Sequence, residues 1–69
     1  MNDKKLEKIV VILPTYNEKN NISNIIKDIT FVLPTAEILV VDDNSPDGTA
    51  KIVRNLIANY SNLSLLENG

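Results

Sequence analysis

The chain has 69 residues and a formal net charge of −2, and it contains no cysteine and no histidine. A chain of this length forms at most one small domain with a marginal core, because it buries only about 60% of the surface that its unfolded form exposes. The composition excludes disulfide bonds, thiolate or imidazole metal sites and histidine-dependent nucleophiles, so any metal must bind through oxygen.

Residues 1–8 form a charged lead-in. Basic residues are sparse and lie mostly near the start, which is typical of a solvated surface and does not support nucleic-acid binding. No apolar stretch approaches the roughly 18 residues of a membrane span, and the charged start lacks the apolar core of a signal peptide. We therefore expect a cytoplasmic protein.

Residues 9–13 are an uninterrupted, mostly β-branched apolar run, which predicts a strand that is covered on both faces, as in parallel sheets. Pro14 is expected to end this strand. Asn20 or Asn21 can cap the helix that follows. Its apolar residues recur at i, i+3, i+4 and i+7 and form one stripe, which consists of Ile22, Ile25, Ile26 and Ile29.

Residues 37–41 predict a second strand, which ends at a pair of acidic residues. The next helix can be capped by Ser45, with Pro46 at the first helical position, or by Asp47. It is expected to end near residues 61–62, and residues 63–66 predict a short third strand. The apolar face of this helix consists of Ile52, Val53, Leu56, Ile57 and Tyr60.

This β-α-β-α-β order predicts a parallel sheet with strand order 3-2-1 and both helices on one face, since such connections are right-handed. The other face would be bare, although the first two strands are apolar at successive positions. We therefore expect residues 9–69 to be the front portion of a larger domain, whose remainder covers this face, or else a partner to cover it.

The acidic pair follows the second strand directly. Because side chains alternate along a strand, Asp42 and Asp43 should point to opposite sides and do not form a paired acid/base device. Asp43 is our candidate to accept hydrogen bonds from a ligand, and Asp42 can accept backbone N–H groups of the following turn. Alternatively, both carboxylates only stabilise the turn and the helix N-terminus.

The loop after the first strand carries the second group of candidates. Tyr16 can form a platform for a nucleobase, and Glu18 can accept from base N–H groups or ribose hydroxyls. Alternatively, Tyr16 packs in the core and Glu18 lies in the first turn of the helix. The helix start after residue 44 could receive an anion, but the nearby acids oppose a phosphate, and a nucleoside contact is favoured. The loop between the first strand and the first helix contains no glycine, which excludes a G-x-G-x-x-G dinucleotide site.

The motif L-P-T-Y-N-E at residues 13–18, together with D-D-N-S-P-D-G-T at residues 42–49, resembles the N-terminal part of family 2 glycosyltransferases, most nearly the dolichol-phosphate mannosyltransferase type. The resemblance runs over residues 9–67 and implies the nucleotide-binding half of a GT-A fold. Asn44, where glycine is frequent in the family, is tolerable because asparagine accepts left-handed geometry. The resemblance places five residues around the guanosine of GDP-mannose: Pro14, Tyr16, Glu18, Val41 and Asp43.

The resemblance also implies a reaction, in which mannose passes with inversion to a polyprenyl (dolichyl) phosphate at the cytoplasmic face of a membrane. A divalent cation, Mg²⁺ or Mn²⁺, would be held by a later D-x-D motif that this chain lacks, so we expect the chain alone to be inactive. Two alternatives remain: a non-catalytic nucleotide-binding module or truncated inactive product, and a phospho-receiver domain. The strand and helix that precede the acidic pair disfavour a receiver domain.

Overall fold

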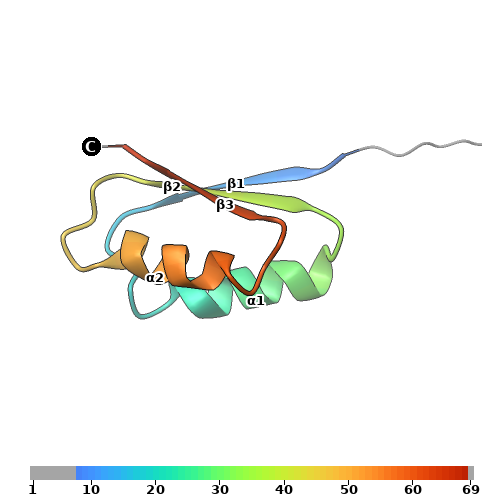
Figure 1. Ribbon diagram of the computed structural model, residues 1–69, viewed down its shortest axis with the longest axis horizontal. Helices are drawn as coiled ribbons and strands as arrows, with labels where there is room; N and C mark the ends of the chain where they lie inside the picture. Colours follow the sequence, from blue (N-terminus) through green and yellow to red (C-terminus); the bar gives the residue numbers. More distant parts are fainter. Residues whose placement is uncertain (1–7, 69) are drawn as a thin grey trace, which may run out of the picture.

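The computed structural model describes residues 8–68. In chain order the elements are β1 (Val10–Thr15), α1 (Ile22–Val32), β2 (Glu37–Asp42), α2 (Thr49–Ile57) and β3 (Leu63–Glu67). The strands are all parallel and are ordered β1-β2-β3, and both helices lie on the same face of the sheet (Figure 1). The predicted fold class and strand order are therefore confirmed. Most of the predicted lead-in lies outside the described residues.

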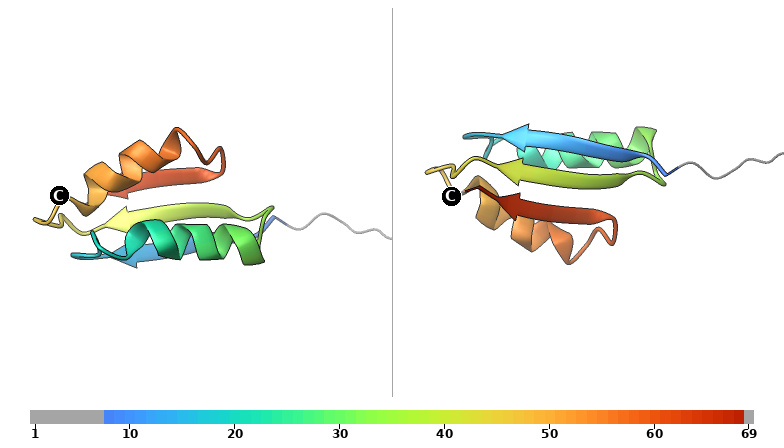
Figure 2. Two further views of the ribbon diagram at one scale, coloured as in Figure 1. Left: turned by 90° about the horizontal axis from the view of Figure 1, so that it is seen from below. Right: turned by 90° about the horizontal axis from the view of Figure 1, so that it is seen from above.

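The core lies between the sheet and the two helices. Alternation along β2 turns Ile38 and Val40 toward the helices, where they are 1% and 0% exposed. Figure 2 shows α1 lying along β1 and β2 and α2 lying along β3. The predicted stripe of α1 supplies Ile22 and Ile26, both fully buried. The remaining members of the buried cluster are Val53 and Leu63.

The opposite face of the sheet is apolar, and no described segment covers it (Figure 1). Val10, Ile12 and Leu66 are 48%, 55% and 54% exposed. Val10 and Ile12 alternate with Val11 and Leu13, which are partly shielded on the helix side. The consecutive apolar residues at positions 10–13 of β1 therefore place one row of side chains against the helices and leave a second row open, as expected.

The prediction that Pro14 ends the first strand is wrong, because β1 continues to Thr15. Glu37 donates its N–H to the carbonyl oxygen of Ile9, and Asp43 donates its N–H to the carbonyl oxygen of Thr15. The backbone N–H and C=O groups of the odd-numbered residues of β1 therefore point toward β2. The nitrogen of Pro14 therefore faces the open edge of the sheet. Proline is tolerated there because no ladder hydrogen bond is lost.

The helix boundaries also differ from the expected ones. Asn21 precedes α1, but its side chain makes no capping hydrogen bond. Helix α2 begins at Thr49 after Gly48, so Pro46 is not its first residue. It ends at Ile57, earlier than predicted, and Ile57 is 36% exposed rather than buried. The reason is a turn in which Tyr60 donates its N–H to the carbonyl oxygen of Ile57 and directs the chain into β3.

Candidate functional site

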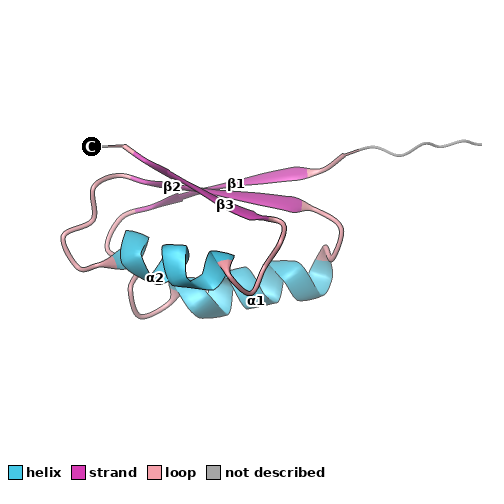
Figure 3. Cartoon of the chain, viewed as in Figure 1, coloured by secondary structure: helices cyan, strands magenta, loops and turns pink. Residues whose placement is uncertain are grey.

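The loops that follow β1 and β2 lie together at the carboxyl edge of the sheet (Figure 3). Each contains one asparagine with a left-handed backbone, Asn17 with φ 56° and Asn44 with φ 55°. Asparagine adopts this conformation more readily than other non-glycine residues, because its short polar side chain can hydrogen-bond locally. Asn44 therefore occupies a left-handed position that glycine would adopt without strain.

Asp42 is built into the fold and is only 1% exposed. Its Oδ1 accepts hydrogen bonds from the hydroxyls of Thr15 (2.8 Å) and Ser45 (2.6 Å), and its Oδ2 accepts the Ser45 N–H (2.9 Å). Burial acts to raise the pKa of Asp42, but the hydrogen bonds from Ser45 and Thr15 outweigh it and lower the pKa. Asp42 thus holds the turn, as expected for one member of the acidic pair.

The two loops are joined by a set of hydrogen bonds that we call the inter-loop clamp. Side-chain oxygens of the second loop and of the first residue of α2 accept three consecutive backbone N–H groups of the first loop. These bonds run from Asn17 N to Ser45 Oγ (2.9 Å), from Glu18 N to Thr49 Oγ1 (3.0 Å) and from Lys19 N to Asp47 Oδ2 (3.0 Å). No local sequence pattern predicts the clamp, and its only signal in the sequence is the spacing of oxygen-bearing side chains at residues 45, 47 and 49.

Asp47 also organises the start of α2. Its Oδ1 accepts the backbone N–H of Thr49 (3.0 Å) and the Thr49 hydroxyl. The N–H group of Thr49, at the helix start that could have bound an anion, is therefore already occupied by Asp47. The hydrogen bond from the Thr49 hydroxyl lowers the pKa of Asp47. Gly48, with φ 92°, lets the chain reverse between the two residues.

Four of the predicted nucleoside-binding residues lie at or just beyond the carboxyl ends of β1 and β2. Pro14 and Val41 are register partners. Tyr16 and Asp43 directly follow the last paired residues of the two strands, Thr15 and Asp42, and the hydrogen bond from Asp43 N to Thr15 O (3.0 Å) keeps the two chain segments together at this point. Tyr16 is 56% exposed, so the alternative that it packs in the core is wrong.

The two acidic candidates, Glu18 and Asp43, differ in their surroundings. Glu18 precedes α1 rather than lying in its first turn, and its Oε1 accepts a hydrogen bond from Asn21 Nδ2 (3.3 Å). Asp43 is exposed, and its carboxylate makes no hydrogen bond or ion pair with another residue of the described part of the chain. Of the two acids, Asp43 has its oxygens available for a ligand.

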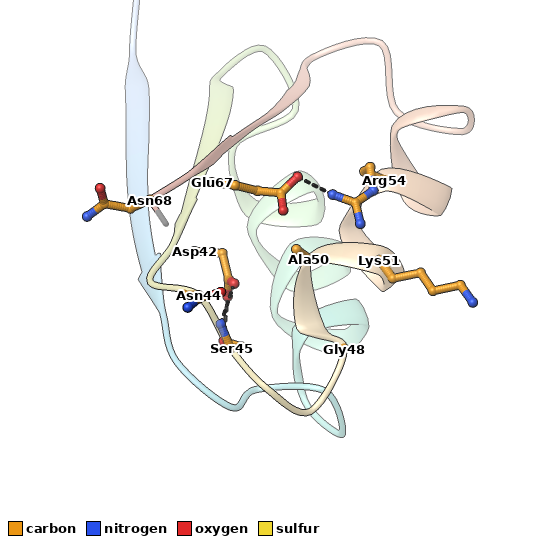
Figure 4. Close-up of a pocket in the computed structure, with 9 residues that line it drawn as sticks. All are labelled: Asp42, Asn44, Ser45, Gly48, Ala50, Lys51, Arg54, Glu67 and Asn68. Atoms are coloured by element: carbon orange, nitrogen blue, oxygen red, sulfur yellow. Dashed lines mark hydrogen bonds and ion pairs between the residues drawn. The ribbon is translucent and has the colours of Figure 1, made fainter.

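A hollow of about 180 Å³ lies on the helix side of the same edge, between α2 and the ends of β2 and β3 (Figure 4). The ion pair between Arg54 and Glu67 crosses one side of it. None of the five predicted nucleoside-binding residues lines this hollow. Its lining consists of Asp42, Asn44, Ser45, Gly48, Ala50, Lys51, Arg54, Glu67 and Asn68.

Within residues 8–68, no three acidic side chains gather into a group that could hold a metal ion. The carboxylate oxygens of Asp42 and Asp47 are already engaged by hydrogen bonds. Residues 8–68 therefore provide no ready-made cluster of ligands for a divalent cation. In the same part of the chain, no helix has the length and apolar character needed to cross a membrane.

Comparison with known proteins gives a consistent result. The family described as Glycosyl transferase family 2 matches residues 10–69. The chain is 44% identical over 50 residues to the polyprenol monophosphomannose synthase of Mycolicibacterium smegmatis, and the aligned region covers 72% of this chain and 19% of that protein. It is 39% identical over 61 residues to protein RfbJ of Shigella flexneri, covering 88% of this chain and 47% of that protein.

A third relative is the dolichol-phosphate mannosyltransferase of Pyrococcus furiosus, which is 42% identical over 55 residues, covering 77% of this chain and 16% of that protein. The chain therefore spans less than half the length of each of these relatives. No solved structure gives a significant match.

Proposed function

The chain belongs to glycosyltransferase family 2, and we propose that it forms the part of such an enzyme that binds the nucleoside of a sugar donor. The observation that carries this proposal is that exposed Tyr16 and exposed Asp43 each directly follow the last paired residue of adjacent parallel strands. An aromatic ring offers a stacking surface for a base, and an ionised carboxylate accepts hydrogen bonds from base N–H or ribose hydroxyl groups. Pro14 and Val41 provide apolar surface beside them.

The donor that we propose is GDP-mannose, and the acceptor is a polyprenyl phosphate at the cytoplasmic face of a membrane. Support comes from relatives whose names describe mannose transfer to polyprenyl or dolichyl phosphates. In this proposal Glu18 adds a second carboxylate near the nucleoside, once its side chain leaves Asn21.

The chemistry divides between this chain and residues outside it. A phosphate acceptor is anionic near neutral pH, so inverting transfer needs little general-base help and depends on positioning. The chain's own residues hold and orient the donor nucleoside. A divalent cation, Mg²⁺ or Mn²⁺, would stabilise the leaving diphosphate when bound by ligands elsewhere in the full enzyme.

Replacement of Asp43 by alanine tests the site. Loss of hydrogen bonds to a charged group costs about 1.5–3 kcal/mol, so we expect the GDP dissociation constant to rise about tenfold or more. Isothermal titration calorimetry measures it. Asp28→Ala is the matched control, since Asp28 is an exposed acid on α1 and should leave the affinity unchanged. Equal GDP affinity in the wild type and in Asp43→Ala would refute the assignment.

We also expect the 69-residue chain alone to transfer no sugar, because the described residues offer no cluster of acids for a metal ion. Purified chain, GDP-mannose labelled in the sugar and a polyprenyl phosphate in detergent make up the assay. Labelled lipid product above the level of a protein-free reaction would contradict this expectation. Nucleotide binding without transfer agrees with it.

A further inference from the structure

We infer that the inter-loop clamp is a positioning device for the nucleoside site: Ser45, Asp47 and Thr49 set the separation of Tyr16 and Asp43 without touching the nucleotide. The inference rests on the proposed function, because it concerns the same site. It adds residues that neither the family resemblance nor the sequence analysis assigned to nucleotide binding.

The first support is the way in which the loop after β1 is held. Residues 17–19 belong to no strand or helix, yet each of their backbone N–H groups donates to a side chain of the other segment. On the sheet side, the hydrogen bond from Asp43 N to Thr15 O ties β1 to the start of the second loop. The residue directly between these attachments is Tyr16, so its backbone is held from both sides.

The second support is that the accepting oxygens are themselves fixed. The Ser45 hydroxyl donates to buried Asp42, and the Asp47 carboxylate accepts the N–H of Thr49 at the start of α2. Thr49 is 0% exposed, so water cannot readily replace its hydroxyl as the partner of Glu18 N. The accepting side chains of the clamp are therefore held in place by Asp42 at the buried end of β2 and by the first residue of α2.

The consequence for binding is geometric. A base stacked on Tyr16 reaches Asp43 only when the two loops keep a fixed separation, and small displacements of positioning groups are costly. Free loops would have to be ordered by the ligand itself, which lowers affinity. The clamp keeps the two sides of the site in place before the nucleotide arrives.

Two substitutions of Thr49 separate its hydroxyl from its methyl group. Thr49→Val keeps the shape but removes the acceptor of Glu18 N, whereas Thr49→Ser keeps the hydroxyl and removes the methyl group. We expect the GDP dissociation constant to rise about tenfold in Thr49→Val and to stay within about twofold of the wild type in Thr49→Ser. Amide hydrogen exchange should accelerate at Asn17, Glu18 and Lys19 in the valine variant only.

A control excludes a simple loss of stability. Ile26→Val removes one methylene from a fully buried core residue that takes no part in the clamp, and it should leave the GDP affinity and the exchange of residues 17–19 unchanged. Circular dichroism establishes that each variant is folded. If Thr49→Val does not fold, Asp47→Ala, which removes the partner of Lys19 N, is measured in the same way.

The outcomes are distinct. Faster exchange at residues 17–19 together with weaker GDP binding in Thr49→Val, rescued in Thr49→Ser, supports the inference. Unchanged exchange, or faster exchange with unchanged GDP affinity, overturns it. A wild-type chain that bound no GDP would overturn the proposed function and the positioning role with it, whereas the exchange measurement would still decide whether the clamp exists.

Discussion

At the scale of single residues, the neighbouring carboxylates at the end of β2 have opposite surroundings. Asp42 is 1% exposed and accepts three hydrogen bonds, while Asp43 is exposed beside Tyr16. Alternation along a strand is enough to predict this division, because adjacent side chains must point to opposite faces. The partners of Asp42 could be predicted only in part: the turn is local, whereas Thr15 lies 27 positions away.

The hydrogen bonds of Asp42 predict a dependence of stability on pH. Its pKa is lowered in the folded chain, so its contribution is fully present above the unfolded pKa of about 3.9 and is lost as the pH falls through the folded pKa. Asp47, whose pKa is also lowered, changes in the same direction. Urea unfolding should therefore show a falling free energy of unfolding below about pH 4.

Asp42→Asn provides the check. At neutral pH the amide cannot accept all three hydrogen bonds, and we expect a loss of about 1–3 kcal/mol in the free energy of unfolding. The difference between variant and wild type should shrink as the pH falls from about 5 to about 2, because the wild-type carboxyl is then protonated as well. A difference that stayed constant over this range would argue against an ionised Asp42 in the fold.

At the scale of elements, periodicity predicted the existence and order of the strands and helices, but not their ends. The stripe of α1 and the buried run of β2 are local patterns and were correctly read. The continuation of β1 through Pro14 depends on which residues face the neighbouring strand, and the start of α2 depends on Gly48 and Asp47. The clamp joins residues 28 and 31 positions apart, which no local pattern encodes.

Gly48 offers a test of the α2 start. Its φ of 92° is unfavourable for any residue with a Cβ, yet no heavy atom lies within 4 Å of the position a Cβ would take. Gly48→Ala should therefore lower the free energy of unfolding by about 1–2 kcal/mol through backbone strain alone. Asn44→Gly, at the other left-handed turn position of this loop, should not destabilise the chain by this amount. Chemical denaturation measures the free energy of unfolding of both variants. A Gly48→Ala variant as stable as the wild type would contradict the left-handed geometry of Gly48.

At the scale of the whole molecule, the sheet has one face packed against helices and one apolar face open among the described residues (Figure 1). The chain spans less than half the length of the relatives compared above, and we propose that further parts of the enzyme cover this face. The right-handed connections predicted this asymmetry. The apolar run at residues 9–13 predicted that the second face is also covered, because a strand with one solvated face normally alternates with polar residues.

Two isoleucines on opposite faces of the sheet test this architecture. Ile38 is 1% exposed and Ile12 is 55% exposed. Truncation to alanine should cost about 2–5 kcal/mol of unfolding free energy at Ile38 and clearly less at Ile12, since only the first creates a cavity. Thermal and urea unfolding of dilute protein provide the comparison. Equal costs at both positions would mean that the open face is packed against something in solution.

The central claim is that Tyr16 and Asp43 form the two sides of a nucleoside site at the carboxyl edge of the sheet. Titration of GDP into the isotopically labelled chain, followed by amide chemical shifts, tests it most directly. We expect saturable shifts confined to residues 14–18 and 41–45, with no shifts in helix α1. Shifts concentrated elsewhere, or no shifts at millimolar GDP, would contradict it.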